Sequence, residues 1–231
     1  VKKVLHYQSR ALFETFRYMD RPDRIGSLVS LSAKTCQMLT DQPHNKRGLV
    51  LLLTHLCGFD LGGFKLANAG FKFLNLTYPN PPAGYRLQND FRRKHNMEVL
   101  PLSFNAMKTA IERLRQGGVV LTGLDRPSPE SEYAPRFYGR PARLPVGHIR
   151  LALKTNSAVR IVGTVAGPDN KYIVDVSDEI SMTPNSDPHE EVIQNAERTL
   201  IETEKFINRD PDRWAMFFPV WPEVEAEIPT S

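Results

Sequence analysis

Residues 48–63 read GLVLLLTHLCGFDLGG, and they contain the signals that decide the fold. Leu49 to Thr54 is an uninterrupted apolar run, too short for an independent helix and preceded by Gly48. Such a run is typical of a strand that is buried on both faces, as in a parallel sheet. After a break at Gly58, a second apolar segment from Leu61 to Ala69 predicts a helix. The order strand, turn, helix predicts an α/β fold around a largely parallel sheet.

The same stretch places two chemically useful side chains beside the turn, His55 at the end of the strand and Asp60 at the start of the helix. On one continuous helix they would point apart, but a turn at Gly58 allows the carboxylate to swing back toward the imidazole. A carboxylate on one ring nitrogen leaves the other nitrogen free to accept a proton. We therefore predict that His55 is a general base oriented by Asp60. The simpler alternative is a strand-end histidine bonded to backbone and an aspartate that only caps the helix.

Cys57 lies two residues from His55, so a cysteine nucleophile with a histidine base is a second hypothesis. The same position also suits a small apolar side chain in the core. The other cysteine, Cys36, lies in a different context, and the pair is typical of reduced thiols in a cytosolic protein. Because the sequence has neither zinc spacing nor a glycine-rich phosphate loop, we expect no metal and no bound cofactor.

Length and charge limit the class of protein. The 231 residues are 41% apolar, which suits one domain with a substantial core, and no run approaches the roughly 20 apolar residues of a membrane span. Residues 1–160 contain 25 Lys and Arg against 11 Asp and Glu, whereas residues 161–231 contain 5 against 15. A basic body favours an anionic partner, and an ordinary solvated surface is the alternative. Without a nucleic-acid-binding motif, and with the aromatic tail in the acidic third, we expect no nucleic acid.

The other elements follow from periodicity and from breaker residues. Further helices are predicted over 4–19, 27–39, 85–95, 103–116, 146–154 and 187–208, and further strands over 71–78, 97–102, 119–124, 158–165 and 171–176. A turn signal at 167–170 predicts that the last two strands form an antiparallel hairpin. The chain is thus predicted to be one domain over 1–231, with a helical preamble at 1–41, an α/β core at 48–208 and an aromatic tail at 209–231.

Three predictions concern surfaces rather than strands and helices. The apolar stripe Leu5, Leu12, Phe13 and Phe16 of the first helix is expected to pack on the sheet, with lipid contact as the alternative. The aromatic residues between Trp214 and Trp221 are expected in the core, with an interface or a membrane-interface belt as alternatives. The basic residues of 1–160 predict binding to anionic vesicles that weakens as salt rises.

The strand predicted over 119–124 ends at Asp125, on the sheet edge that also receives His55. Ligands of open α/β sheets bind at this edge, so Asp125 joins the candidate site with its role open. The helix predicted over 85–95 carries Arg92 and Arg93, which we predict to bind phosphate, although a solvated basic face is the simpler interpretation.

Several segments stand in an order that adds to these observations. His55 to Asp60 has the form His-x-x-x-x-Asp, Leu114 to Gly118 reads LRQGG before Asp125, and residues 137–152 read FYGRPARLPVGHIRLA. Together they resemble the His-x-x-x-x-Asp/Glu, L-K-x-G…D and F-F-G-x-x-A-x-T-x-G-x-x-x-L-A segments of the lipid A biosynthesis late acyltransferases. That family of lauroyl and myristoyl transferases belongs to the glycerolipid and lysophospholipid acyltransferase superfamily, and the resemblance covers nearly the whole chain.

The resemblance implies a glycerolipid-acyltransferase-like domain with the following site residues. His55, Asp60 and Asp125 would be catalytic, and Arg92, Arg93, Tyr78, Phe137 and Gly139 would bind substrate. A fatty acyl group would pass from acyl carrier protein or a coenzyme A thioester to a hydroxyl of a membrane lipid or glycolipid. No covalent acyl-enzyme would form, and an arginine or a backbone N–H would stabilise the oxyanion. A lysophospholipid acyltransferase and an inactive lipid-binding homologue are the alternatives.

The resemblance also implies a place in the cell. Its members work at an anionic membrane surface, on the cytoplasmic face of the inner membrane, and we expect a membrane segment upstream of Val1. The chain departs from the family pattern at three points. No Arg separates Tyr78 from Pro79, Leu144 replaces a Thr, and Phe217-Phe218-Pro219 replaces an aromatic-His-Arg segment. Since two of these changes remove basic groups, an acceptor other than the usual bisphosphorylated sugar is an open alternative.

Overall fold

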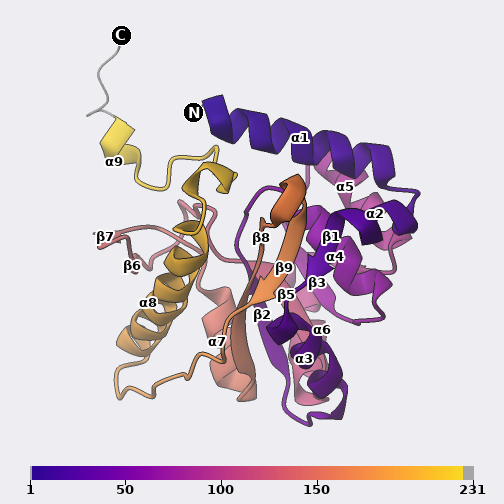
Figure 1. Ribbon diagram of the computed structural model, residues 1–231. Coiled ribbons are helices and arrows are strands. Elements are labelled where there is room, and N and C mark those ends of the chain that lie inside the picture. Colours follow the sequence, from indigo (N-terminus) through magenta and orange to yellow (C-terminus); the bar gives the residue numbers. More distant parts are fainter. Residues whose placement is uncertain (1, 226–231) are drawn as a thin grey trace.

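The centre of the fold is a seven-stranded sheet, seen in a computed structural model that describes residues 2–225 (Figure 1). The strand order is β1-β9-β8-β2-β5-β3-β4. The strands are β1 (Val29–Leu31), β2 (Leu49–Leu53), β3 (Leu74–Thr77), β4 (Glu98–Pro101), β5 (Val119–Gly123), β8 (Ala158–Ala166) and β9 (Tyr172–Val176). Within this sheet, as described over residues 2–225, only β8 and β9 pair antiparallel, which confirms the mixed, largely parallel sheet and the predicted hairpin.

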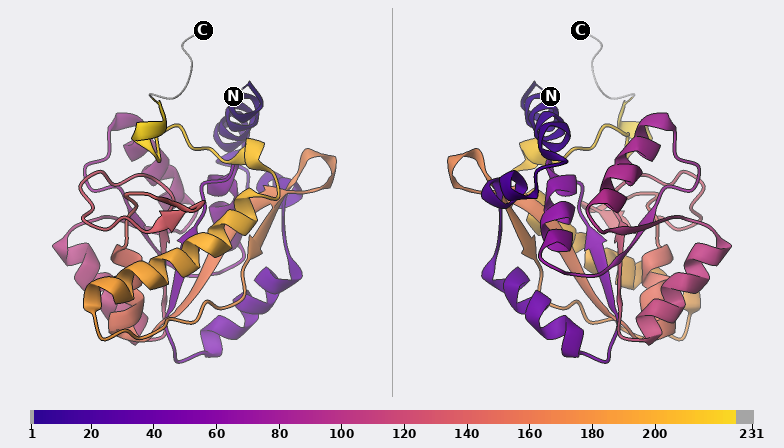
Figure 2. Two further views of the ribbon diagram at one scale, coloured as in Figure 1. Left: turned by 90° about the vertical axis from the view of Figure 1, so that its left-hand side faces the viewer. Right: turned by 90° about the vertical axis from the view of Figure 1, so that its right-hand side faces the viewer.

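Helices cover both faces of this sheet, and in Figure 2 α8 crosses one face diagonally. The helices are α1 (Lys2–Tyr18), α2 (Pro22–Leu28), α3 (Ala33–Asp41), α4 (Phe59–Asn68), α5 (Ala83–Lys94), α6 (Phe104–Arg115), α7 (Gly147–Thr155), α8 (Pro188–Ile207) and α9 (Pro222–Glu225). Short 3-10 turns lie at η1 (Gln42–His44), η2 (Pro168–Asn170) and η3 (Pro211–Arg213), and β6 (Arg136–Phe137) pairs with β7 (Arg140–Pro141). Core contacts place α6, α7 and α8 on one face and α2 to α5 on the other.

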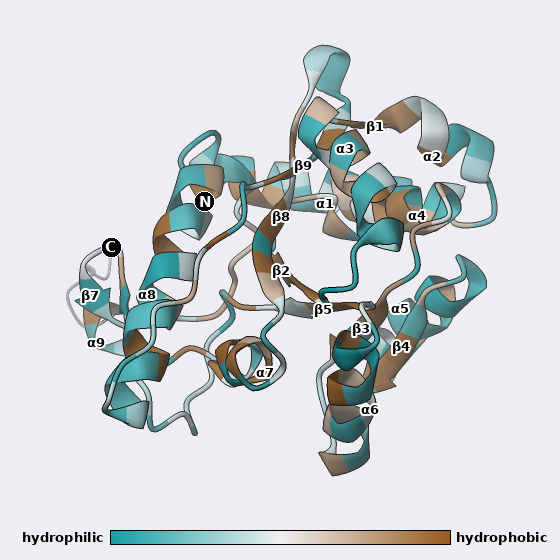
Figure 3. Ribbon diagram, turned by 90° about the horizontal axis from the view of Figure 1, so that it is seen from below, coloured by the Kyte–Doolittle hydropathy of each residue, from teal (hydrophilic) through white to brown (hydrophobic). Residues whose placement is uncertain are grey.

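The central strand β2 shows how the core is divided. Val50 and Leu52 point into the cluster beneath α6, α7 and α8, whereas Leu49 and Leu51 point into the cluster beneath α2 to α5. Successive side chains of a strand point to opposite faces, so a strand covered on both faces must be apolar at every position. Each such side chain contributes about 2 kcal/mol on burial. In Figure 3 the brown strands lie between helices that turn much of their teal surface outward.

The N-terminal region is not the purely helical preamble that the sequence predicts. The predicted helix 27–39 is wrong at Val29–Leu31, which form β1 and pair in parallel with β9. Ser32 then accepts a hydrogen bond from the Thr35 N–H and starts α3. The run Val29-Ser30-Leu31 alternates in polarity and fits either period. These residues form a strand because they pair with the edge of β9, a contact that the local sequence pattern does not show.

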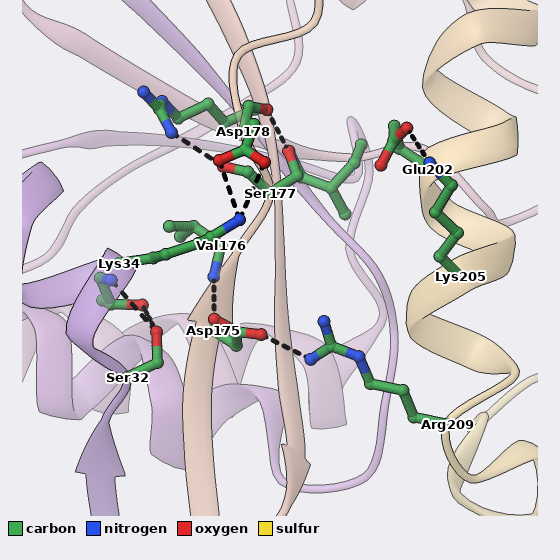
Figure 4. A network of polar contacts seen from close by, with 12 residues as sticks. Ser32, Lys34, Asp175, Val176, Ser177, Asp178, Glu202, Lys205 and Arg209 are labelled. Carbon is green, nitrogen blue, oxygen red and sulfur yellow. Dashed lines mark hydrogen bonds and ion pairs between the residues drawn. The ribbon is translucent and has the colours of Figure 1, made fainter.

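Polar contacts join β9 and the segment after it to helices from both layers (Figure 4). Lys34 of α3 reaches both carboxylate oxygens of Asp178 at 2.8 Å, and Arg209, just beyond α8, contacts Asp175 at 2.5 Å. Burial raises the pKa of Asp175, but hydrogen bonds from Ser32 and Arg209 outweigh burial and lower it. Because solvent screens such pairs, they align the edge of the sheet rather than supply most of its stability.

Candidate active site

The candidate site lies where β2 and β5 end. These two strands are parallel neighbours, and Leu53 stands opposite Gly123. His55 and Asp125 each follow two residues later, so the strand register brings them together at the C-terminal edge of the sheet. The His55 Nδ1 atom is 2.5 Å from Asp125 Oδ1. Both residues are buried, with 7% and 0% of their surface exposed.

The Asp125 carboxylate accepts three hydrogen bonds. Oδ1 faces the His55 ring, and Oδ2 accepts from the His55 backbone N–H and from Trp214 Nε1–H, each at 2.9 Å. Burial raises the pKa of Asp125, but attraction to the His55 ring and these hydrogen bonds outweigh burial and lower it. An ionised carboxylate can only accept, so the shared proton belongs to Nδ1. The lone pair of His55 therefore lies on Nε2, the atom that a base requires.

The predicted pairing of His55 with Asp60 is wrong, because Asp60 turns toward α5. Its Oδ1 accepts from Arg92 Nε at 2.8 Å and lies 2.8 Å from Arg92 Nη2. Gly58 sits in the left-handed region at φ +86° and sets the direction in which α4 leaves the turn. That direction presents Phe59, not Asp60, to the imidazole, with ring centroids 5.1 Å apart in an edge-to-face arrangement.

Gly123 gives the imidazole its space. A Cβ at this position would lie 2.6 Å from His55 Cε1, closer than real side-chain contacts allow. Position 123 of β5 therefore needs a glycine, because the ring of His55 packs against the strand at this point. The backbone carbonyl of His55 is held as well, because it accepts from the Ala215 N–H at 2.8 Å. The ring is thus confined by β5, by Phe59 and by the C-terminal tail.

The two arginines predicted to bind phosphate differ in their surroundings, because Arg92 is buried and Arg93 is exposed. Arg92 is 4% exposed, and besides Asp60 it donates to Asn89 Oδ1 at 2.7 Å and lies 5.2 Å from the centre of the Tyr85 ring. Burial lowers the pKa of Arg92, but Asp60 and Tyr85 outweigh burial and raise it, so Arg92 is a charged tie between α4 and α5. Arg93 donates to Asp90 at 2.8 Å on the outer side of α5.

The other predicted substrate-binding residues separate into two groups. Tyr78 is 62% exposed and lines the largest cavity near the sheet edge. Phe137, by contrast, is fully buried between Trp214 and Trp221, with ring centroids 5.8 and 5.6 Å away. Gly139 has φ +74° and forms the turn between β6 and β7, where nothing lies within 4 Å of an added Cβ. Phe137 and Gly139 therefore shape the core and a turn.

Cys57 is a core residue. Its side chain is fully buried with Ala11 and Ala215, and its N–H donates to the Arg213 carbonyl at 2.7 Å. Burial raises the pKa of Cys57 to about 11, so at neutral pH it is a thiol and a poor nucleophile. The geometry favours His55 acting as a base toward substrate over a Cys57 acyl-enzyme.

Two cavities beside this edge of the sheet share lining residues. The larger, of about 890 Å³, is lined by Tyr78, Tyr85, Arg126, Ala134, Arg143, Phe218, Val220, Glu223 and six prolines. The smaller, of about 80 Å³, lies between α1 and the turn at Gly58, Phe59 and Asp60. Tyr85 and Arg126 line both cavities. A mostly apolar cavity with two guanidinium groups suits an amphiphile with an anionic group.

Arg126 is a site residue that the sequence reasoning missed. It follows Asp125 directly, lies 5.7 Å from the centre of the Phe218 ring, and has a buried Nε without a partner among residues 2–225. Its position after a strand-end aspartate could have suggested it. Trp214 was missed as well, and no local signal could have found it, because it contacts Asp125 from 89 residues away.

The helix α1 covers this end of the sheet, with the C-terminal segment beside it (Figure 1). Contrary to the predicted packing, three of the four stripe residues are exposed, Leu5 by 50%, Phe13 by 59% and Phe16 by 45%, whereas Leu12 is partly buried. The inner face instead buries Ala11, Glu14 and Thr15. Glu14 accepts from the Tyr172 hydroxyl at 2.6 Å, so close polar contacts rather than a large apolar face hold α1 in place.

The aromatic tail is divided in a similar way. Trp214 and Trp221 are partly buried against the core, whereas Phe217 and Phe218 are 52% and 54% exposed. Over residues 2–225, no helix is both long and apolar enough to cross a membrane.

Comparisons with known proteins identify the family of this chain. The family described as bacterial lipid A biosynthesis acyltransferase matches residues 1–223. Two proteins of Mycobacterium tuberculosis, from strains CDC 1551 / Oshkosh and ATCC 25618 / H37Rv, are called phosphatidylinositol mannoside acyltransferase. Each is 32% identical to this chain over 116 residues, which are 48% of this chain and 37% of the relative. The match thus spans little more than a third of each relative. With nearly the full length matched by the family, this chain belongs to the bacterial lipid A biosynthesis acyltransferases.

Proposed function

We propose that this chain transfers a fatty acyl group from an acyl thioester to a hydroxyl of a membrane glycolipid or phospholipid. The observation that carries the proposal is the buried His55–Asp125 pair, in which an ionised carboxylate holds Nδ1–H and leaves Nε2 basic. Family membership supports the reaction class.

The chemistry follows from the tautomer. Nε2 of His55 takes the proton of the acceptor hydroxyl while its oxygen attacks the thioester carbonyl carbon. The imidazolium that forms is stabilised by Asp125, and a backbone N–H or a nearby arginine stabilises the oxyanion. When the tetrahedral intermediate collapses, the C–S bond breaks and the thiolate takes the proton back from Nε2. An ester and a free thiol result, and no acyl-enzyme is required.

Arg126 is our candidate for binding a phosphate of the lipid substrate. It lines both cavities, and most residues that line the larger one are apolar, which suits acyl chains. The relatives' names direct attention to a mannosylated phosphatidylinositol, an acceptor that carries both a phosphate and sugar hydroxyls. We therefore propose a phosphate-bearing glycolipid as acceptor. The thioester carrier is acyl carrier protein or coenzyme A.

A membrane surface is the proposed place of reaction, on the cytoplasmic face of the inner membrane. Segments at the C-terminal edge of the sheet expose large apolar side chains. These are Leu5, Phe13 and Phe16 of α1, Tyr78 after β3, Leu87 of α5, Leu102 and Phe104 after β4, and Phe217 and Phe218 of the tail. Such a concentration beside a cavity favours contact with lipid over a fully solvated edge.

Transfer assays with mass spectrometry of the product test the proposal. The protein would receive acyl-CoA or acyl carrier protein thioesters together with mixed lipid acceptors, among them phosphatidylinositol mannosides. We expect an acylated acceptor, and His55→Ala should lower the rate about 100-fold or more without unfolding the protein. Cys57→Ala is the control and should remain active. Lipid binding without product would support the inactive homologue, and an S-acyl adduct on Cys57 would support the nucleophile hypothesis.

A further inference from the structure

The C-terminal tail returns to the site as a short strand-like segment. Cys57 N–H donates to the Arg213 carbonyl at 2.7 Å, Ala215 N–H donates to the His55 carbonyl at 2.8 Å, and Leu56 and Trp214 form an antiparallel bridge between them. This pairing fixes the backbone of Trp214 beside the residue that carries the candidate base. The buried Arg213 contacts Asp210 at 2.8 Å and stacks over Tyr7 of α1, which anchors the segment further.

From that position Trp214 reaches a second residue of the site. Its indole Nε1–H donates to Asp125 Oδ2 at 2.9 Å. The other two donors to the carboxylate, the backbone and the ring of His55, both belong to one residue. Without Trp214, both remaining hydrogen bonds to the carboxylate would come from His55. The indole links the carboxylate to the C-terminal segment that carries Trp214, and this link fixes the position of the Asp125 side chain.

We propose that Trp214 is a positioning residue of the acyl-transfer site, which holds Asp125 through Oδ2 so that Oδ1 keeps the His55 ring in its reactive orientation. This inference rests on the proposed function for its effect on rate, but the hydrogen bond itself can be tested separately. Removing a donor to the ionised form raises the pKa of a carboxyl, and a buried carboxylate that loses a partner also moves more freely.

The chain supplies its own control, because it has two tryptophans. Trp221 also packs on Phe137, with ring centroids 5.6 Å apart, but its buried Nε1 has no hydrogen-bond partner among residues 2–225. Replacement by Phe removes the same atoms at both positions and keeps an aromatic ring. Only at position 214 does the change remove a hydrogen bond to the candidate catalytic pair.

The first experiment is the rate of acyl transfer as a function of pH for Trp214→Phe and Trp221→Phe in the whole chain. Trp214→Phe should lower kcat about tenfold or more, with KM changing less, and move the acid limb of the profile to higher pH, because a carboxylate that loses a donor is a stronger base and holds the proton of the pair more tightly. Trp221→Phe should keep the acid limb of the parent protein. A Trp214→Phe profile that overlays the parent would overturn the proposal.

The second experiment does not depend on turnover. The two indole N–H signals of the ¹⁵N-labelled protein, assigned with the two Phe variants, should respond differently to Asp125→Asn and to pH. The Trp214 signal should shift in Asp125→Asn and should titrate with the pair in the unmodified protein, whereas the Trp221 signal should do neither. An invariant Trp214 signal would overturn the proposal even in an active enzyme. If the Trp214 signal responds but the protein shows no transfer activity, the hydrogen bond to Asp125 is supported and the proposed function is contradicted.

Discussion

Asp125 decides the chemistry available to His55. A buried carboxylate with one donor would be costly, but this one has three N–H partners, and its pKa stays low. It can therefore hold the imidazole at neutral pH and support the positive charge that develops when His55 takes a proton. Asp60 has a different task. It neutralises Arg92, which is 4% exposed and joins α4 to α5.

The two carboxylates should respond differently to the same substitution. Asp125→Asn should lower transfer about 100-fold or more and alter the acid limb of the pH–rate profile, because the amide cannot hold Nδ1–H as an anion does. Asp60→Asn should destabilise the fold by about 3–5 kcal/mol, because it leaves the Arg92 charge buried and unpaired. Chemical denaturation and pH–rate profiles measure the two effects. If Asp60→Asn changed the acid limb in a protein of normal stability, the sequence-based pairing would be the better description.

Substitution of Arg126 tests the proposed phosphate contact. Arg126→Gln should raise KM for a phosphate-bearing lipid about tenfold or more, the effect of losing a charge-assisted hydrogen bond, and leave kcat nearly unchanged. The exposed Arg140 on β7 provides the control, because Arg140→Gln removes the same charge at a position that lines neither of these two cavities. Steady-state kinetics with varied acceptor separates the outcomes. A fall in kcat with KM unchanged would assign Arg126 to the oxyanion instead.

Among the helices, α7 contains an unusual buried side chain. His148 lies in its first turn, is 5% exposed, and has a buried Nε2 without a partner among residues 2–225. Burial lowers the pKa of His148 from 6.5 to about 4. The neighbouring Val146 and Ile149 pack on Val192 and Ala196 of α8, so a charge on His148 would arise beside the contact between two helices.

The pH dependence of stability follows from this helix. The unfolded chain binds a proton at His148 below about pH 6.5, whereas the folded chain binds it only near pH 4. The contribution of His148 to the free energy of unfolding is therefore fully present above pH 6.5 and is lost as the pH falls toward 4. The loss amounts to roughly 3 kcal/mol. In His148→Leu this component of acid sensitivity should vanish in urea unfolding curves between pH 7 and 4. The exposed His44 serves as control, and equal flattening by His44→Leu would contradict the assignment.

At the scale of the whole molecule, the candidate site lies at an end of the sheet where several large apolar side chains are exposed. The parallel strands deliver their C-terminal ends there, and the exposed stripe residues of α1 and the exposed pair Phe217 and Phe218 lie on segments beside that end. We predict that the excess of basic residues in 1–160 adds attraction to anionic lipid. Apolar insertion and charge would then act together.

Vesicle co-sedimentation separates the two contributions. The protein should bind anionic vesicles more than neutral ones, and salt should weaken the difference, since the Debye length falls from about 10 Å at 0.1 M to about 3 Å at 1 M. The double substitution Leu5→Ser with Phe13→Ser should lower binding to both kinds of vesicle about tenfold or more. Moving each of these apolar side chains from water into lipid stabilises the bound state by about 1.5–3 kcal/mol, and the serines lose this contribution. Ile201→Ser on α8, which is also 52% exposed, should leave binding unchanged. Equal loss in both variants would argue against a defined docking edge.

The sequence by itself determined the local structure and the chemical candidates. Apolar runs predict β2 and β5, glycine and aspartate turn signals predict the β8–β9 hairpin, and strand-end positions predict His55 and Asp125, because these signals act over a few residues. Only the tertiary structure decided which residues meet. His55 pairs with Asp125 rather than Asp60 because β2 and β5 are neighbours in register, although the residues are 70 apart in sequence. The edge of β9 made a strand of Val29–Leu31, and close polar packing left most of the stripe of α1 exposed. Such contacts depend on strand order and on long-range packing, which the period of a local segment does not encode.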